Sequence, residues 1–174
     1  MRNHIWKFFG WEQSNPLSFY IMDIIFRKIF RRNADTPWAV HFTSTIHSPK
    51  NLTHGVGVWP GDAPNNYFNA MNGIHVGDYT NFGPNVSVVS ANHDLVDNSQ
   101  HVKAPPIHIG KKCWIGANVT ILPSVHLGDF TIVGAGSVVT KSFTEGYCVI
   151  AGNPAKIIKY LDKSACIQSF EKDY

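Results

Sequence analysis

The sequence predicts an all-β solenoid, a parallel β-helix with a helical segment before it and a short helix after it. The first observation is a ladder of apolar residues at every sixth position, most of them followed by glycine or another small residue. The second is one interruption of that ladder, and the third is a change of pattern at both chain ends. A fixed short period is typical of solenoids in which each repeat supplies one short strand and one turn.

The ladder occupies two stretches of the chain. Hexapeptides begin at Val76, Phe82 and Val88, and the ladder resumes with Ile109, Ile115, Ile121, Leu127, Val133 and Val139. Counting back by six from Val76 mostly reaches good interior residues, so we expect the same register to start near Val40. Three hexapeptides would make one triangular coil. Residues 18 apart should therefore stack, as His75 and His93 do in this count.

The interruption covers residues 94–106 and begins directly after His93. An insertion into a solenoid must leave the wall as a surface loop, and such loops often lie on the binding face. We therefore interpret residues 36–155 as a β-helix domain that carries an excursion loop over residues 94–106. We expect recognition of a ligand there and in the irregular coil of residues 59–73.

The N-terminal segment, residues 1–35, is predicted to be aromatic, basic and helical. Residues 1–13 hold four aromatic side chains and are hard to assign, whereas Asn15-Pro16 is typical of an N-cap followed by the first helical residue. Apolar residues then recur at helical spacing over residues 17–32, with basic residues in the last turn. This helix either packs on the β-helix or a partner subunit, or it lies on an anionic membrane through residues 15–32.

The C-terminal segment, residues 156–174, is predicted to cap the β-helix. Gly152-Asn153-Pro154 indicates a turn, and we expect a helix from Ala155 to about Glu171. Such a helix would cover the open edge of the last coil, which otherwise invites strand pairing.

Composition excludes several classes of protein. Hydrophobic content of 44% with 16% charged residues favours one folded domain. The net charge of +3 comes from the first 35 residues, so the body lacks the basic stripe of a nucleic-acid-binding protein. Three cysteines without CxxC spacing argue against a disulfide framework or zinc ribbon. With no evident signal peptide, we expect a cytoplasmic protein, either free or peripheral on the inner membrane surface.

The motifs WIGANVTILP, VGAGSVVTK and AGNPAK lie within residues 109–156. Together they resemble hexapeptide-repeat acyltransferases, above all sugar O-acetyltransferases of the maltose and galactoside type and capsular or exopolysaccharide acetyltransferases. The resemblance covers roughly residues 40–160. It implies a left-handed β-helix, a homotrimer, and acetyl-CoA bound as acyl donor in a groove between subunits. The six-residue period alone would not give this hand, because parallel crossovers are usually right-handed.

His93 is the predicted general base. Acyl transfer to a hydroxyl needs a group that removes a proton and later returns it to the departing thiolate, and an imidazole titrates near neutral pH. His93 matches the family's Asn-His position beside the loop. Asp94 or a backbone carbonyl would orient the ring. Direct transfer needs no Ser or Cys nucleophile, and Cys113 fits a small interior position.

Donor-binding residues follow from the resemblance, position by position. It implies that Trp114 lies in the groove and that the backbone of Ala117 meets the pantetheine arm or the thioester oxygen. Lys156 would lie near the nucleotide phosphates, although an ordinary solvated surface lysine also fits. The far end of the cofactor would be lined by Ala135, Thr140 and Lys141. On the acceptor side, Asn72 and His75 either face the cleft of His93 or are ordinary turn residues.

Two other classes of protein remain open. Metal-dependent β-helix enzymes that resemble γ-type carbonic anhydrase use histidines five apart, and none of the nine histidines here has that spacing. A non-catalytic scaffold that docks through its basic helix is the second. We expect an acetyl-CoA-dependent O-acetyltransferase of a saccharide hydroxyl that needs no metal, acting for example on a polysaccharide precursor. The sequence does not separate it from an N-acetyltransferase of an amino sugar.

Overall fold

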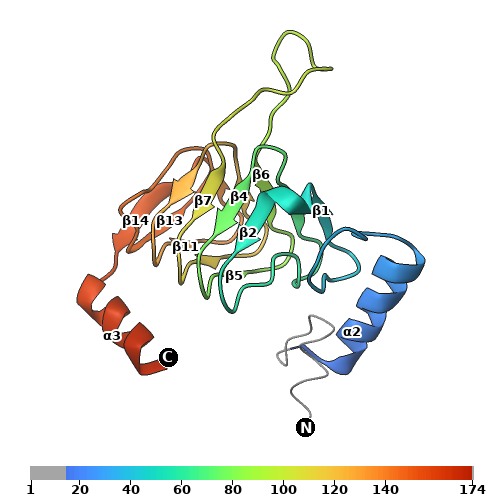
Figure 1. The fold of residues 1–174 in the computed structure, drawn as a ribbon. Coiled ribbons are helices and arrows are strands. Elements are labelled where there is room, and N and C mark those ends of the chain that lie inside the picture. The colour runs from blue at the N-terminus through green and yellow to red at the C-terminus, as the bar shows by residue number, and fades with distance from the viewer. Residues whose placement is uncertain (1–14, 174) are drawn as a thin grey trace.

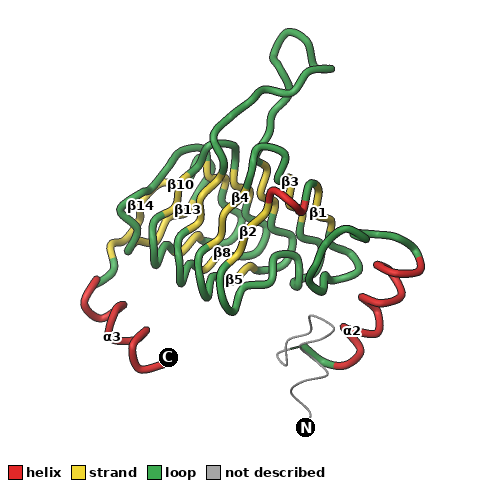
Figure 2. The backbone as a smooth tube through the Cα atoms, viewed as in Figure 1, coloured by secondary structure: helices red, strands yellow, loops and turns green. Residues whose placement is uncertain are grey.

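The computed structural model describes residues 15–173. The aromatic stretch of residues 1–13 lies outside this range. The described chain forms a stack of short strands with one helical segment at each end of the stack and one long loop standing out from it (Figure 1). Tracing the backbone by secondary structure shows how short the strands are and how much of the stack is turn (Figure 2).

Three sheets form the walls of the stack. Sheet A holds β1 (Thr45–His47), β3 (Tyr67–Asn69), β6 (Ser87–Val89), β9 (Thr120–Ile121) and β12 (Val138–Val139). Sheet B holds β2 (Leu52–His54), β4 (Ile74–Val76), β7 (Ile107–Ile109) and β10 (His126–Leu127). Sheet C holds β5 (Asn81–Phe82), β8 (Trp114–Ile115), β11 (Ile132–Val133), β13 (Cys148–Ala151) and β14 (Lys156–Tyr160).

From β3 to β12 the chain passes through sheets A, B and C in rotation, and neighbouring strands in each sheet are parallel. This arrangement fits the predicted β-helix. The apolar ladder forms its interior: all nine ladder residues, from Val76 to Val139, are buried. The six-residue period therefore predicted the inward-facing positions of this part of the chain correctly, because each wall contributes one such position per turn of the chain.

Before Val76 the count by six holds only in part. Most of the positions that it reaches are buried, namely Val40, Ile46, Leu52, Val58 and Ala70, but Pro64 is exposed and the coils do not keep the expected length. Ile46 pairs with Phe68, and Phe68 pairs with Val88, so these coils are longer than the expected 18 residues. Extra residues in the turns absorb the difference, and Phe68 rather than Pro64 fills the interior. The regular spacing holds after the loop, where Ile121 pairs with Val139.

Glycine follows many ladder residues because successive coils approach closely there. A Cβ atom added at Gly77 would lie 2.6 Å from the backbone nitrogen of Lys111 in the next coil. One added at Gly116 would lie 2.8 Å from the backbone nitrogen of Ala135. Both distances are far below ordinary van der Waals contact, so these two corners accept no larger residue without movement of the backbone.

The excursion between β6 and β7 is larger than predicted and has its own structure. His93 and His101 form an antiparallel bridge, and Val102 donates a backbone hydrogen bond to Asn92 at 2.9 Å. The loop is thus a hairpin-like arm that leaves the wall before His93 (Figure 1). We call residues 92–102 the hairpin arm. His93, which we expected to precede the excursion, therefore lies on the stem of the arm.

The helical prediction for residues 17–32 is largely confirmed. Helix α2 (Leu17–Asp23) continues into the π-helix η1 (Ile24–Ile29), and Pro16 rather than Asn15 occupies the N-cap position. A short 3₁₀-helix, η2 (Pro49–Asn51), joins β1 to β2. None of the helices within residues 15–173 is long and apolar enough to cross a membrane.

The predicted C-terminal helix begins later than expected. Residues 156–160 form β14, which pairs antiparallel with β13, and helix α3 covers Lys163–Asp173. The open edge of sheet C is therefore continued by a strand of opposite direction. β-branched Ile157 and Ile158, between two lysines, favour this strand over the helix that we expected.

Candidate active site

His93 projects from the stem of the hairpin arm and is exposed. Its Nδ1 atom lies 2.6 Å from the carbonyl oxygen of Asn98, across the arm. A carbonyl oxygen only accepts hydrogen bonds, so Nδ1 carries the proton in the neutral ring and Nε2 keeps its lone pair. The ring also packs beside His101, with ring centroids 4.3 Å apart. The arm thus fixes both the orientation and the tautomer of His93.

The Asp94 carboxylate does not orient the His93 ring, although it was the first of the two orienting groups that we expected. Its Oδ1 atom accepts backbone hydrogen bonds from Val96 at 2.8 Å and Asp97 at 3.0 Å. These bonds close the turn at the tip of the arm and lower the pKa of the Asp94 carboxyl. Of the two orienting groups that we expected for His93, the backbone carbonyl is the one in contact. Asp94 shapes the arm and does not touch the imidazole through any hydrogen bond among the described residues.

Asn72 fastens the arm to the wall. Its Nδ2 atom donates to the carbonyl oxygens of Ser90 at 3.0 Å and Val102 at 2.9 Å, one on each side of the arm. Its backbone nitrogen also donates to the Ser90 hydroxyl at 2.9 Å. The side chain of Asn72 therefore holds the two ends of the arm together, and its role toward an acceptor stays a prediction.

His75 does not stack on His93, which corrects the expected 18-residue spacing. It lies on β4, where its ring stacks on His108 of β7 with centroids 4.8 Å apart. Its Nδ1 atom lies 2.7 Å from the Thr53 hydroxyl. The hairpin arm accounts for the wrong spacing, because it lengthens this coil. His75 therefore pairs with His108, 33 positions later in the chain. His75 thus belongs to the outer face of sheet B.

Trp114, Ala117 and Ala135 lie close to one another on a different edge. Trp114 lies on β8, where it pairs with Asn81 of β5 and Ile132 of β11. Ala117 and Ala135 occupy equivalent turns one coil apart, between sheets C and A, and Gly136 donates a backbone hydrogen bond to Ala117 at 2.8 Å. Trp114 is 48% exposed, so its indole is available to a ligand.

The remaining candidates divide between the two edges. Lys156 lies on β14 opposite Ala151 and belongs with sheet C. Thr140 and Lys141 follow β12 and lie between sheets A and B, on the side from which the hairpin arm leaves. Within one chain, sheet A therefore separates the edge of His93, Thr140 and Lys141 from the edge of Trp114, Ala117 and Ala135.

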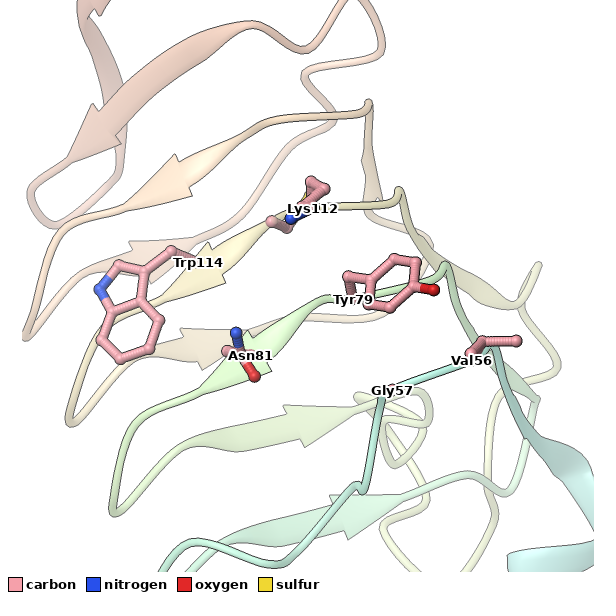
Figure 3. Close-up of a pocket in the computed structure, with 7 residues that line it drawn as sticks. Val56, Gly57, Tyr79, Asn81, Lys112 and Trp114 are labelled. Carbon is pink, nitrogen blue, oxygen red and sulfur yellow. The ribbon is translucent and has the colours of Figure 1, made fainter. Parts of the chain in front are cut away.

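An open pocket of about 510 Å³ lies on sheet C beside Trp114. Figure 3 shows the side chains of Trp114 and Asn81 on neighbouring strands of this pocket. Sequence reasoning found Trp114 but missed Tyr79, Asn81 and Lys112 in the lining. The available signal was their place in the repeat: Asn81 has the same hexapeptide position as Trp114, and Tyr79 and Lys112 share the position two residues earlier.

Cys113 borders the same pocket but is not suited to nucleophilic chemistry. Its side chain is 1% exposed, and burial raises the pKa of the thiol to about 12. Since a thiolate rather than a thiol is the nucleophile, Cys113 is inert near neutral pH. The prediction that it is an interior residue is confirmed.

The described residues hold no group of three or more His, Cys, Asp or Glu side chains arranged to hold a metal ion. His75 and His108, which approach one another, are stacked ring against ring.

The comparisons with known proteins agree with this architecture. Residues 106–141 match the family described as bacterial transferase hexapeptide (six repeats). A maltose O-acetyltransferase from Clostridium difficile 630 is 32% identical with a TM-score of 0.60, over 66% of this chain and 62% of that protein. A hexapeptide-repeat acetyltransferase from Vibrio cholerae O1 biovar eltor, complexed with acetyl-CoA, is 25% identical with a TM-score of 0.59, over 69% of each chain. A search of curated proteins found no matching sequence.

A galactoside acetyltransferase in complex with coenzyme A shares the fold, with a TM-score of 0.62 at 20% identity over 90% of this chain and 88% of that one. The present chain carries the hexapeptide repeat of bacterial transferases, and its resemblance to the hexapeptide-repeat acetyltransferases is confirmed. It spans 62% of the length of the Clostridium difficile maltose O-acetyltransferase.

Proposed function

We propose that this protein transfers an acetyl group from acetyl-CoA to a hydroxyl of a saccharide, with His93 as general base. The observation that carries the proposal is the bond between Nδ1 of His93 and the Asn98 carbonyl, which leaves Nε2 as the basic atom on an exposed ring. The likeness to a maltose O-acetyltransferase at 32% identity supports the acceptor class, and the likeness to an acetyltransferase that holds acetyl-CoA supports the donor.

The reaction proceeds by direct attack. Nε2 of His93 takes the proton of the acceptor hydroxyl while the acceptor oxygen bonds to the thioester carbonyl carbon. The resulting oxyanion collapses, the carbon–sulfur bond breaks, and the proton passes from the imidazolium to the departing thiolate of coenzyme A. Backbone N–H groups near Ala117 would stabilise the oxyanion, as the family resemblance implies. The products are an acetyl ester and free coenzyme A.

The two separated edges are proposed to meet between copies of the chain in a left-handed β-helical homotrimer. His93, Thr140 and Lys141 of one copy would then face Trp114, Ala117 and Ala135 of its neighbour, with Lys156 toward the nucleotide phosphates. The hairpin arm supports this arrangement, since Leu95 and Val96 at its tip are fully exposed apolar residues. Apolar tips of this kind favour contact with another surface.

An acetyl-CoA consumption assay over mono- and oligosaccharides tests the function. Release of coenzyme A thiol that depends on one saccharide, with an added acetyl mass in that saccharide, is the expected result. Hydroxylamine then separates the two alternatives, because it cleaves an O-acetyl ester and leaves the N-acetyl amide of an amino sugar intact. Failure to bind acetyl-CoA in calorimetry would contradict the proposal and favour a non-catalytic scaffold. Loss of activity on metal removal would favour the metal-dependent class instead.

A further inference from the structure

The N-terminal helical segment is attached to the body of the protein through a buried ion pair. Asp23 and Arg27, one turn apart, are both buried and form an ion pair with an N···O distance of 2.6 Å. Asp23 also accepts a backbone hydrogen bond from Val40 at 3.0 Å, and Arg27 donates to the carbonyl of Thr36 at 2.7 Å. These bonds attach the helix to the chain just before β1. The inner side of the helix thus combines this ion pair with aromatic contacts, such as that between Phe26 and Phe42.

The apolar side of the same helix points to solvent. Leu17, Ile21 and Ile24 follow one another at spacings of four and three residues, which places them on one helical face. They are 57%, 48% and 37% exposed, and Ile29 and Phe30 at the end of the segment are 68% and 67% exposed. We call these five residues the outer face. Exposed apolar side chains gathered on one short segment mark a contact surface, so the outer face is suited to contact another apolar phase.

Basic residues accompany the outer face. Lys28 continues the row of Leu17, Ile21 and Ile24, and Arg31 lies just beyond the helix; both are exposed. The one acidic residue inside the helix, Asp23, is neutralised by Arg27. An apolar face bordered by cations is complementary to the acyl chains and anionic headgroups of a lipid surface.

We propose that the outer face binds an anionic lipid membrane, with the helix lying in the plane of the interface. The segment is too short to span a bilayer. A second copy of this chain is a poorer occupant, because its own outer face offers further cations rather than anionic partners. The helix lies at the end of the stack opposite α3 (Figure 1). This inference rests on the helix alone and not on the proposed enzymatic activity.

Co-sedimentation of the full chain with vesicles tests the proposal. We expect binding to vesicles rich in phosphatidylglycerol, weak binding to pure phosphatidylcholine vesicles, and loss of binding in high salt. The double variant Ile21→Gln/Ile24→Gln should lower the partition coefficient on the order of tenfold or more, because two apolar side chains no longer leave water. Lys28→Gln should lower it roughly fivefold on anionic vesicles only.

Ile158→Gln is the matched control, since Ile158 is an exposed isoleucine on β14 at the other end of the stack. It should leave vesicle binding unchanged. Absence of vesicle binding by the unmodified chain would overturn the proposal. A concentration-dependent rise in mass that Ile21→Gln/Ile24→Gln abolishes, without vesicle binding, would likewise overturn it and assign the outer face to a second copy. Acetyl transfer to a soluble saccharide should be the same for the double variant, which separates this test from that of the catalytic proposal.

Discussion

His93 shows how a single backbone contact can give a side chain its chemical asymmetry. The Asn98 carbonyl holds the proton on Nδ1, so the opposite nitrogen is basic without help from a carboxylate. The sequence predicted the residue and left the orienting group open between Asp94 and a backbone carbonyl. That choice depends on the path of the hairpin arm, because the contact joins residues five positions apart through a turn that no six-residue pattern describes.

At the residue scale, the folded protein disfavours the ionised form of the Asp62 carboxyl. Desolvation raises its pKa from 3.8 to about 6, and the backbone N–H of Ala63 only partly offsets this. Ionisation is therefore disfavoured in the folded state, so Asp62 costs stability as the pH rises through 6, and the cost disappears below about 4. We expect Asp62→Asn to be more stable by about 2 kcal/mol at pH 8, and by well under 1 kcal/mol at pH 4.

Denaturant titrations at the two pH values measure this difference. Asp35→Asn serves as the control, because Asp35 is exposed and its neutralisation should change the free energy of unfolding by less than about 0.5 kcal/mol. Equal effects of Asp62→Asn at pH 4 and pH 8 would show that burial does not disfavour the Asp62 carboxylate.

At the element scale, the ladder and its interruption were predictable, whereas the exact registers were not. Interior positions such as Ile115 and Val133 can be recognised in the sequence, because only apolar residues fit a packed column. Turn lengths carry no such signal, so the longer coils before Val76 went unrecognised. The same reason explains the mistaken stack of His75 on His93, since a count by six cannot measure the length of the hairpin arm.

Asn72 provides a test of how the arm is held. Asn72→Ala removes both side-chain hydrogen bonds to the arm bases, at Ser90 and Val102. We expect proteolysis within the arm to accelerate roughly tenfold, because two hydrogen bonds no longer oppose its opening. The KM for the saccharide should rise, while the dissociation constant for acetyl-CoA should stay unchanged.

Asn51→Ala is a suitable control for that variant. Asn51 also donates a side-chain hydrogen bond to a backbone carbonyl, that of Met71, but it does not contact the arm. Unaltered proteolysis of the arm in Asn72→Ala would mean that other contacts hold it in place.

At the scale of the whole molecule, one chain does not bring its candidate site together. His93 and Trp114 lie on edges that sheet A separates, so the proposed site would need a second copy of the chain. Composition and period describe one solenoid and contain no information on how copies meet. The trimer therefore came from resemblance alone, and the separation of the edges is the structural reason to test it.

Mixed oligomers provide that test. His93→Ala and Trp114→Ala should each be weakly active alone, because each lacks one side of every site. Co-expressed, they should regain activity, since some interfaces then combine an intact His93 with an intact Trp114 from the neighbouring copy. If mixed oligomers of verified composition recover no activity, His93 and Trp114 do not act together in a site formed by two copies.

The central claim is that His93 removes the acceptor proton, and steady-state kinetics of His93→Ala tests it most directly. With an identified saccharide, kcat should fall about 10²- to 10⁴-fold, as expected for loss of a general base, with acetyl-CoA binding and thermal unfolding unchanged. His101→Ala, on the facing strand of the arm, should lose less than about tenfold. A folded His93→Ala protein with near-normal turnover would contradict the account.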